Sequence, residues 1–215
     1  MRETKNGADQ MSKAIAISAG VAVVALVGGA LAMSSIFAPA DRFAACRASQ
    51  VAGGDIGGPF TLVDENGVTV TDQDVITGPT LVYFGYTFCP DVCPLDNMRN
   101  ALAIHELDER GVEVTPVFIS IDPARDTPEL LKDFTDNFHE RMIGLSGTEE
   151  QVAAASRAYR TYFAKQDSDD PEYYLMDHTT MSYLVFPEYG FVEFFRRDVT
   201  PEDMADRLEC FVEAS

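Results

Sequence analysis

A run of 24 residues without a charge, from Ala14 to Phe37, follows a short charged segment at the start of the chain. At a rise of ~1.5 Å per residue, a helix of this length spans roughly 36 Å, more than the ~30 Å hydrocarbon core of a bilayer. Lys13 closes the run on one side and Asp41 on the other. The run therefore predicts a single transmembrane helix, with the folded part of the protein after it.

Positive residues lie on both sides of this run, slightly more of them before it. The positive-inside rule therefore favours a cytoplasmic N-terminus. The segment before the run is short and mixed in charge, unlike an Arg- and Ser-rich transit peptide, so we predict a bacterial inner-membrane protein whose domain faces the periplasm. The predicted organisation is a cytoplasmic tail (1–13), a transmembrane anchor (14–37), a linker (38–54) and one folded domain (55–215).

Two other interpretations of the N-terminal run are less favoured. A cleavable signal peptide would fit the small residues Ala38-Pro39-Ala40, but its apolar stretch is normally ~7–15 residues, far shorter than this one. A lipoprotein modified at Cys46 would need an apolar run up to the cysteine, and Asp41 and Arg42 interrupt it. We therefore expect an uncleaved anchor.

The composition excludes several classes of protein. The formal net charge is −19 and the pI is near 4.3, which excludes a general nucleic-acid binder and argues against adhesion to anionic lipid surfaces. Hydrophobic residues make up 46% of the chain, with 14 Phe and 8 Tyr, enough to build a core. Four cysteines are too few for a disulfide-dense scaffold.

Strand and helix patterns alternate along the domain and predict an α/β fold with a mixed sheet. Asn66-Gly67 between apolar runs predicts a hairpin over 60–71. Further strands are expected at 79–86, 112–121, 181–186 and 191–196, and helices at 94–110, 148–163, 201–212 and from Pro128 onward. Thr127 is expected to cap the helix that begins at Pro128. In the helix over 94–110 the expected apolar face is Leu95, Met98, Leu102 and Leu107.

The chemistry is concentrated in Cys89-Pro90-Asp91-Val92-Cys93-Pro94, directly after a predicted central strand and directly before a helix. Pro94 at the first helical position would make Cys93 the cap, where free N–H groups and the helix dipole lower a thiol pKa. A thiolate of this kind is both a nucleophile and a metal ligand. The competing interpretation is a pair of structural cysteines, or a plain structural bridge.

Two thiolates need a further ligand to hold a metal ion firmly, and the chain has three histidines. His105 lies among acidic residues of a helix and is expected on a solvated face. His139 lies near a predicted helix end, where the helix dipole stabilises a positive charge. His178 follows an acidic loop and ranks first, narrowly. Soft thiolates with an imidazole suit copper or zinc, whereas four cysteines in two unlike contexts do not form a ferredoxin cluster.

Three blocks of the chain together resemble the Sco/SenC family of copper chaperones. The first is Tyr83 to Pro94, which contains the cysteine pair. The second is Ile119 to Pro128, and the third is Asp177-His178-Thr179 with the Tyr183-Leu184-Val185 that follows. The blocks occur in the family's order, and the resemblance covers about residues 55–213 as well as the single N-terminal anchor.

The resemblance implies a thioredoxin-like fold with an added N-terminal β-hairpin. It implies copper, as Cu(I) or Cu(II), bound by Cys89, Cys93 and His178. The implied role is delivery to the binuclear copper centre on subunit II of cytochrome c oxidase. An upstream copper donor or a thioredoxin-like reductant would then be a further partner, and the protein would be a metallochaperone, not an enzyme.

Some questions stay open from the sequence. Cys46 and Cys210 lie outside the family blocks, and either form a bridge from the linker to the last helix or are unrelated. The block around Asp122 is interpreted as structural, with Asp126 or Thr127 capping a helix, and a supporting role for Asp122 beside the metal ligands is the less favoured alternative. Asp177 either orients the imidazole of His178 or is a solvated loop residue.

The main alternative function uses the same two cysteines. A thiol–disulfide reductase would keep the copper-site cysteines of the oxidase reduced. In the chaperone, by contrast, oxidation of Cys89 and Cys93 to a disulfide would abolish copper binding, so the redox state would control copper loading. His178 discriminates between the two, because a reductase has no evident need for an imidazole beside its dithiol. A thioredoxin-type peroxidase ranks low, since no separate Thr-x-x-Cys motif is present, and a redox or copper sensor stays open.

Overall fold

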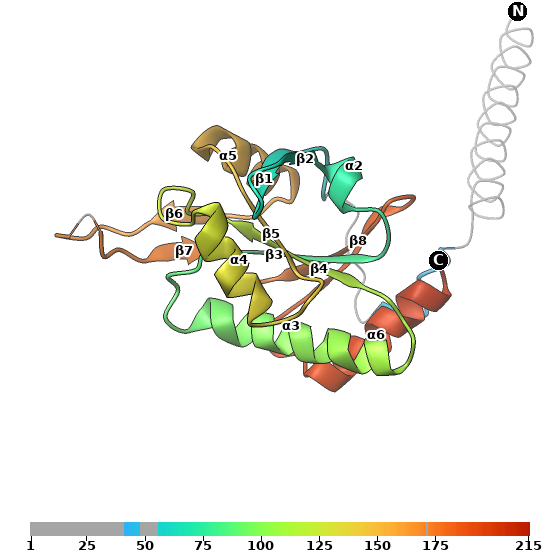
Figure 1. Cartoon of the computed structure of the whole chain (residues 1–215). Helices are drawn as coiled ribbons and strands as arrows, with labels where there is room; N and C mark the ends of the chain where they lie inside the picture. Colours follow the sequence, from blue (N-terminus) through green and yellow to red (C-terminus); the bar gives the residue numbers. More distant parts are fainter. Residues whose placement is uncertain (1–40, 48–55, 171) are drawn as a thin grey trace, which may run out of the picture. The chain divides into compact units, whose positions relative to one another are not determined.

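The structure is a computed structural model that describes residues 41–47, 56–170 and 172–215 (Figure 1). Its strands are β1 (Thr61–Asp64), β2 (Thr69–Thr71), β3 (Thr80–Gly85), β4 (Thr115–Ser120), β5 (Ile143–Ser146), β6 (Phe163–Lys165), β7 (Met176–His178), β8 (Ser182–Phe186) and β9 (Gly190–Phe195). The described helices are α2 (Asp72–Val75), α3 (Val92–Glu109), α4 (Pro128–Asp136), α5 (Glu149–Ala158) and α6 (Pro201–Glu213).

Seven strands form one mixed sheet in the order β2-β1-β5-β4-β3-β8-β9. Strands β3, β4 and β5 are parallel, with α3 and α4 in the crossovers, and the outer strands pair antiparallel. The hairpin of β1 and β2 turns at Gly67, whose φ of 78° lies in the left-handed region that glycine tolerates. The α/β class, the mixed sheet and the added N-terminal hairpin are therefore confirmed.

Strand β3 is the central element that carries the chain to the cysteines. All six of its residues are buried, and it lies between parallel β4 and antiparallel β8. An uninterrupted apolar and aromatic strand is expected where both faces of a sheet are covered. The carboxyl end of β3 therefore delivers the next residues to the edge of the sheet, where α/β folds place their sites.

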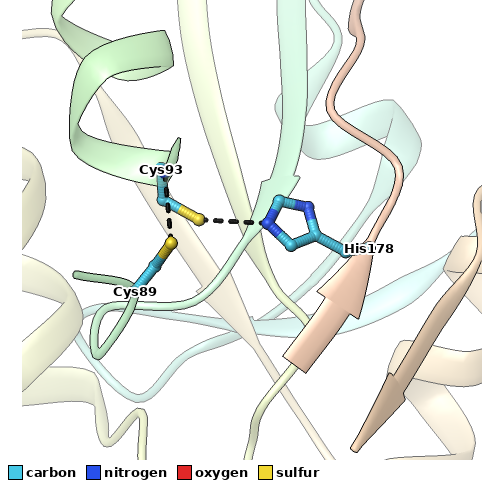
Figure 2. A group of neighbouring side chains, drawn as sticks. All are labelled: Cys89, Cys93 and His178. Carbon is cyan, nitrogen blue, oxygen red and sulfur yellow. Dashed lines mark hydrogen bonds between the residues drawn. The ribbon is translucent and has the colours of Figure 1, made fainter. Parts of the chain in front are cut away.

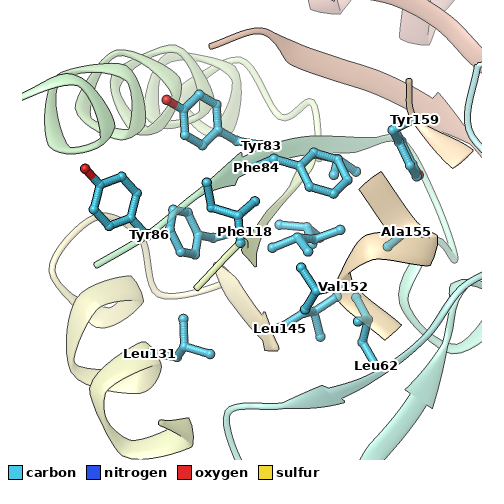
Figure 3. Packing of buried hydrophobic residues seen from close by; sticks show 14 of the residues in the cluster. Leu62, Tyr83, Phe84, Tyr86, Phe118, Leu131, Leu145, Val152, Ala155 and Tyr159 are labelled. Carbon is cyan, nitrogen blue, oxygen red and sulfur yellow. The ribbon is translucent and has the colours of Figure 1, made fainter. Parts of the chain in front are cut away.

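Buried side chains cover both faces of the sheet because strand residues alternate between them. Figure 3 shows one cluster, in which Phe84 of β3 packs on Tyr159 with ring centroids 5.3 Å apart, beside Val152 of α5. On the other face, Leu81 of the same strand joins a cluster with Leu107 of α3 and residues of α6. Helix α3 packs along α6.

Helix α3 does not bury the apolar face that its sequence predicts, and this expectation is wrong for most of the helix. Leu95, Met98 and Leu102 are 58%, 46% and 49% exposed, and only Leu107 is buried. The inner face of the first turns is polar instead: the buried residues there are Asp96, Asn97, Arg99 and Asn100. Each of these four side chains has hydrogen-bond partners, which is what permits their burial.

Three further differences from the predicted elements have local causes. The helix expected over 148–163 ends at Ala158, because Arg160 turns the backbone left-handed with φ 53°, and no glycine or proline marks that end. Phe163 therefore begins β6 instead of ending a helix. The sequence patterns predict neither strand β5 nor the one-turn helix α2, because each is four residues long and too short for a clear hydrophobic periodicity.

The residues before the hairpin include part of the predicted linker. Phe43 is 4% exposed and packs between Phe186 and Phe211, and Cys46 forms a disulfide with Cys210 of α6. Of the two possibilities for these cysteines, the structure therefore has the bridge. The run over 14–37 lies outside the described residues, and no helix among the described residues is long and apolar enough to cross a membrane.

Candidate metal centre

The structure brings Cys89, Cys93 and His178 together from three elements. Cys89 lies in the loop after β3, Cys93 is the second residue of α3, and His178 is the last residue of β7. The possible ligand atoms of the three residues all lie within 4.8 Å of one another. His178, which the sequence shows after an acidic loop, ends the short strand β7.

Figure 2 shows how the three side chains meet. The Nε2 atom of His178 lies 3.4 Å from the Sγ of Cys93, and the backbone N–H of Cys93 donates a hydrogen bond to the Sγ of Cys89 over 3.3 Å. Both sulfur atoms and one ring nitrogen therefore face a common point. Cys89 is 9% exposed, Cys93 is fully buried and His178 is half-buried, so Cys89 is the more accessible of the two sulfur atoms.

The orientation of the imidazole is set by its other nitrogen. Nδ1 of His178 lies 3.0 Å from the carbonyl oxygen of Thr179, which can only accept a hydrogen bond, so Nδ1 carries the proton. Nε2 is then left with its lone pair toward the sulfur atoms, the form in which histidine binds metals. Asp177 does not orient this ring, because its carboxylate accepts a hydrogen bond from Gln166 instead.

Two tyrosines hold the strand and the ring in place. The rings of Tyr83 and Tyr86 meet the imidazole edge to face, at centroid distances of 6.2 and 5.9 Å. The hydroxyl oxygen of Tyr86 also accepts the backbone N–H of Met176 over 3.2 Å, which ties β7 to the main sheet. His178 therefore depends on contacts between segments about 90 residues apart in the sequence.

The two thiols have opposite pKa shifts, and the sequence assigned the lowered one to the wrong cysteine. The helix cap is Asp91, two residues earlier than expected, so Cys93 lies inside the first turn. Hydrogen bonds from the side chain and the backbone N–H of Cys93 lower the pKa of the Cys89 thiol, whereas the adjacent Cys89 sulfur and burial raise the pKa of Cys93. Cys89 is therefore the thiolate and Cys93 the protonated partner.

Gly85 leaves the space that Cys93 occupies. A Cβ at this position would lie 2.9 Å from the Sγ of Cys93 and 2.9 Å from the ring of Tyr83. Both distances are shorter than real Cβ contacts allow. The glycine in Tyr83-Phe84-Gly85-Tyr86 is thus required by the close approach of the sulfur atom to the strand.

The Asp122 block is structural, as expected, and it positions the site. Thr127 is the helix cap, accepting a hydrogen bond from the backbone N–H of Leu130. Asp126 is buried and accepts hydrogen bonds from Ser120 and from both the backbone and the hydroxyl of Thr87, two residues before Cys89. The sequence interpretation missed this contact, and the Ser and Thr at the two strand ends are the only local signal for it.

Asp122 contacts the segment just before β7, the strand that ends at His178. Its carboxylate accepts hydrogen bonds from the hydroxyl of Tyr174 over 2.7 Å and from the guanidinium of Arg125. Arg125 in turn lies over the rings of Tyr174 and Phe88, at 3.5 and 4.8 Å from their centroids. These contacts hold the segment before β7 against the segment before Cys89.

The other two histidines lie elsewhere. His105 follows Cys93 by twelve residues on α3, about 18 Å along the helix axis, and it is exposed as expected. His139 was expected at a helix end and does follow α4, but it is buried, at 3% exposure, beside Asp108. Neither belongs to the group of Cys89, Cys93 and His178.

Two sulfur ligands and one neutral imidazole make a soft, three-coordinate donor set. Such a set suits Cu(I) and tolerates zinc, and the single imidazole adds some affinity for Cu(II). Three ligands leave a side of the ion open to a fourth ligand. The arrangement can therefore both hold an ion and exchange it.

Comparison with known proteins identifies the family. The family model described as SCO1/SenC matches residues 48–213. The protein SenC of Rhodobacter capsulatus is 54% identical over 204 residues, which cover 94% of this chain and 92% of SenC. The chain belongs to the SCO1/SenC family.

Solved structures of SCO1/SenC proteins have the same fold. The crystal structure of Arabidopsis thaliana ScoI with copper bound matches 74% of this chain and 99% of its own, at 38% identity and a TM-score of 0.69. Bradyrhizobium japonicum ScoI with copper bound matches 72% of this chain and 98% of its own, at 40% identity and a TM-score of 0.65. The thioredoxin-like fold that the sequence resemblance implied is therefore confirmed.

Proposed function

We propose that this protein is a copper chaperone, which binds one copper ion with Cys89, Cys93 and His178. The observation that carries the proposal is the imidazole of His178: its Nδ1 proton is held by the carbonyl of Thr179, and its Nε2 lies 3.4 Å from the Cys93 sulfur. A dithiol that only exchanges electrons has no use for a neutral imidazole fixed in this way. The copper-bound ScoI relatives support the choice of metal.

The two cysteines would load the ion in different protonation states. Cys89 is already a thiolate, so it offers the first ligand without loss of a proton. Cys93 is protonated, and its proton would leave to solvent as copper takes its place. The more exposed Cys89 is then the ligand that a partner's thiolate replaces first when the ion is passed on.

We further propose that the ion is delivered to the binuclear copper centre on subunit II of cytochrome c oxidase. Delivery proceeds by exchange of ligands: an incoming thiolate occupies the open side of the ion, and Cys89 or Cys93 leaves. An upstream carrier would supply the copper by the same exchange in reverse. Copper is thereby never released free into solution.

The exposed apolar residues of α3 support a docking surface for this exchange. Leu95, Met98 and Leu102 follow Cys93 along the solvent side of the same helix, and Phe88, 50% exposed, precedes Cys89. Exposed apolar patches of this kind mark interaction sites. Substitution of Met98 by Gln should slow copper transfer to a subunit II domain while leaving copper retention unchanged.

The membrane arrangement is part of the same proposal. Residues 14–37 anchor the protein in the bacterial inner membrane, the tail over 1–13 stays in the cytoplasm, and the domain lies in the periplasm. The length of the uncharged run and the positive residues before it support this orientation. A target whose copper centre lies on the same side of that membrane would be within reach.

The alternative, a thiol–disulfide reductase, is favoured by one observation: the two thiols are split into a thiolate and a protonated partner. The Cys89 thiolate would attack a target disulfide, forming a mixed disulfide and releasing one target thiolate. Cys93 would then lose its proton and displace the second, leaving the target reduced and Cys89–Cys93 oxidised. A thioredoxin-like reductant would restore the dithiol.

The deciding experiment is a Cu(I) titration against a competing chelator, with the reduced protein kept free of oxygen. We expect one copper per chain, lost in Cys89→Ala and weakened about tenfold or more in His178→Ala. Disulfide reduction of a model substrate is measured on the same variants. A chain that holds copper poorly, and reduces the substrate equally well with and without His178, is a reductase instead.

A further inference from the structure

A cleft of about 530 Å³ opens at the end of the sheet opposite the cysteines. Its walls come from the segment before β1, from α2, from the residue after α5 and from the hairpin of β8 and β9. Val185 in this wall pairs with Thr80, the first residue of β3, whereas Cys89 lies beyond the last residue of that strand. Small-molecule sites have volumes of about 300–1,000 Å³, so the cleft is large enough for an organic ligand.

One of the residues that line this cleft carries a buried hydroxyl group without a partner. Tyr159 is 1% exposed, and its hydroxyl has no hydrogen-bond partner among the described residues. The tyrosine ring packs against Phe84 and Tyr183, at centroid distances of 5.3 and 5.8 Å, which fixes the position of the hydroxyl. An unpaired buried hydroxyl destabilises a folded protein, and a polar group bound in the cleft would supply the missing partner.

The charge of the cleft selects the kind of polar group. Asp72, half-buried at the start of α2, is the one charged side chain among the described residues that line it. Its carboxylate accepts the backbone N–H of Phe60 over 3.3 Å and has further acceptor positions left for a ligand. Burial and, after it, the negative charge of Asp72 raise the pKa of the Tyr159 hydroxyl, so the two polar groups are within electrostatic reach of each other. A positively charged ligand with several N–H donors complements both groups.

Most of the remaining wall is apolar or aromatic. Ile56, Ile76 and Phe191 line the cleft and are half-buried, so each offers hydrocarbon surface to a ligand. Tyr189, at the exposed rim, already receives a cation: the guanidinium of Arg42 lies over its ring, 4.7 Å from the centroid. Aromatic faces attract positive charge in this way. The cleft therefore suits a ligand with a short cationic end and an apolar remainder.

We propose that this cleft binds a small primary amine with an apolar stem, in its ammonium form. Of the three N–H donors of the ammonium group, one binds the carboxylate of Asp72 and one binds the hydroxyl oxygen of Tyr159. The stem packs on Ile56 and Phe191. Asp72 disfavours an anion, and the net charge of −19 favours cations near the protein surface. The site lies away from Cys89, Cys93 and His178, and it does not depend on the copper proposal.

The test titrates n-butylammonium into the full-length chain by calorimetry, with 1-butanol as the neutral probe of equal length. We expect one saturable site for the amine and at least about tenfold weaker binding of the alcohol, because hydrogen bonds between charged groups are the stronger kind. Asp72→Asn keeps an acceptor for Phe60 and should weaken amine binding at least about tenfold. Asp198→Asn is the matched control: this carboxylate is 79% exposed, outside the cleft, and its loss should leave amine binding unchanged.

A second variant tests the hydroxyl group. Tyr159→Phe should weaken amine binding about threefold to tenfold, while the free protein unfolds at the same or a higher temperature, because an unpaired buried hydroxyl has been removed. Far-UV circular dichroism checks that each variant is folded. The proposal is overturned by absence of saturable amine binding, by equal binding of amine and alcohol, by equal effects of Asp72→Asn and Asp198→Asn, or by unchanged amine binding in Tyr159→Phe.

Discussion

The two pairs of cysteines in this protein have the same side chain and opposite states. Cys89 and Cys93 are thiols four residues apart, whereas Cys46 and Cys210 form a disulfide across 164 residues with Cα atoms 5.6 Å apart. The first pair has N–H donors and an imidazole around its sulfur atoms. The second pair lies in an apolar cluster with Phe43 and Phe211. Surroundings, and not residue type, decide what each thiol does.

The comparison also separates function from stability. The thiol pair lies where a strand delivers it to a helix start, and it is free to change its bonding partners. The disulfide joins the segment before the domain to the last helix, and so restricts the unfolded chain over nearly its whole domain. Each pair should therefore be removable without the loss of what the other supplies.

Removal of the thiol pair should have the largest effect. With Cys89→Ser and Cys93→Ser together, Cu(I) retention against a chelator should fall by more than ~100-fold, since only the imidazole of the proposed ligand set is left. The matched variant with Cys46→Ala and Cys210→Ala should retain Cu(I) like the natural protein. Equal copper loss in both variants would contradict the separation.

Removal of the disulfide should lower stability instead. Cys46→Ala with Cys210→Ala should reduce the free energy of unfolding by about 2–5 kcal/mol, measured by urea denaturation. The natural protein unfolded in a strong reductant should approach the same value. A variant as stable as the natural protein would mean that the apolar cluster alone holds the linker segment.

Crowding the thiol pair should have a smaller effect on both properties. Gly85→Ala places a Cβ 2.9 Å from the Cys93 sulfur and should cost about 1–3 kcal/mol of stability as well as weaken copper binding. Gly78→Ala is the control, because nothing lies within 4 Å of its Cβ position. If the two alanine variants behave alike, the sulfur does not need the space that Gly85 leaves.

The difference between the two free thiols should appear as a pH profile. Because the Cys89 pKa is lowered, its thiolate persists as pH falls below the ordinary value of ~8.5. Alkylation by iodoacetamide should therefore stay nearly constant from about pH 8 to 6, where an ordinary thiol slows ~tenfold per unit. The product should be at Cys89, read by mass spectrometry of the reduced protein. A profile that falls steeply would mean that Cys89 is not the thiolate.

The sequence predicts best where one segment carries its own signal. The hairpin at Asn66-Gly67, the buried run of β3 and the cap at Thr127 all follow from neighbouring residues. The pairing of Cys89 and Cys93 with His178 was reached from the family resemblance, since β6, which pairs with β7, had no recognisable pattern. Contacts such as Asp126 with Thr87, or Tyr86 with Met176, join distant segments and have no local signature.

The cysteine assignment shows a second limit. Pro94 predicts a helix cap at Cys93, but the helix begins at Val92, and the thiolate is Cys89. A shift of two residues in a helix start is within the ordinary uncertainty of a boundary, yet it exchanges the roles of two sulfur atoms. Site chemistry therefore depends on details finer than an element boundary.

The exposed apolar residues of α3 have a consequence for how copies of this protein behave in solution. Leu95, Met98 and Leu102 leave apolar surface exposed, and a net charge of −19 keeps identical copies apart. That repulsion reaches ~10 Å at 0.1 M salt but only ~3 Å at 1 M. The colloidal stability of the protein should thus fall as salt rises, with the exposed face of α3 becoming the contact between copies.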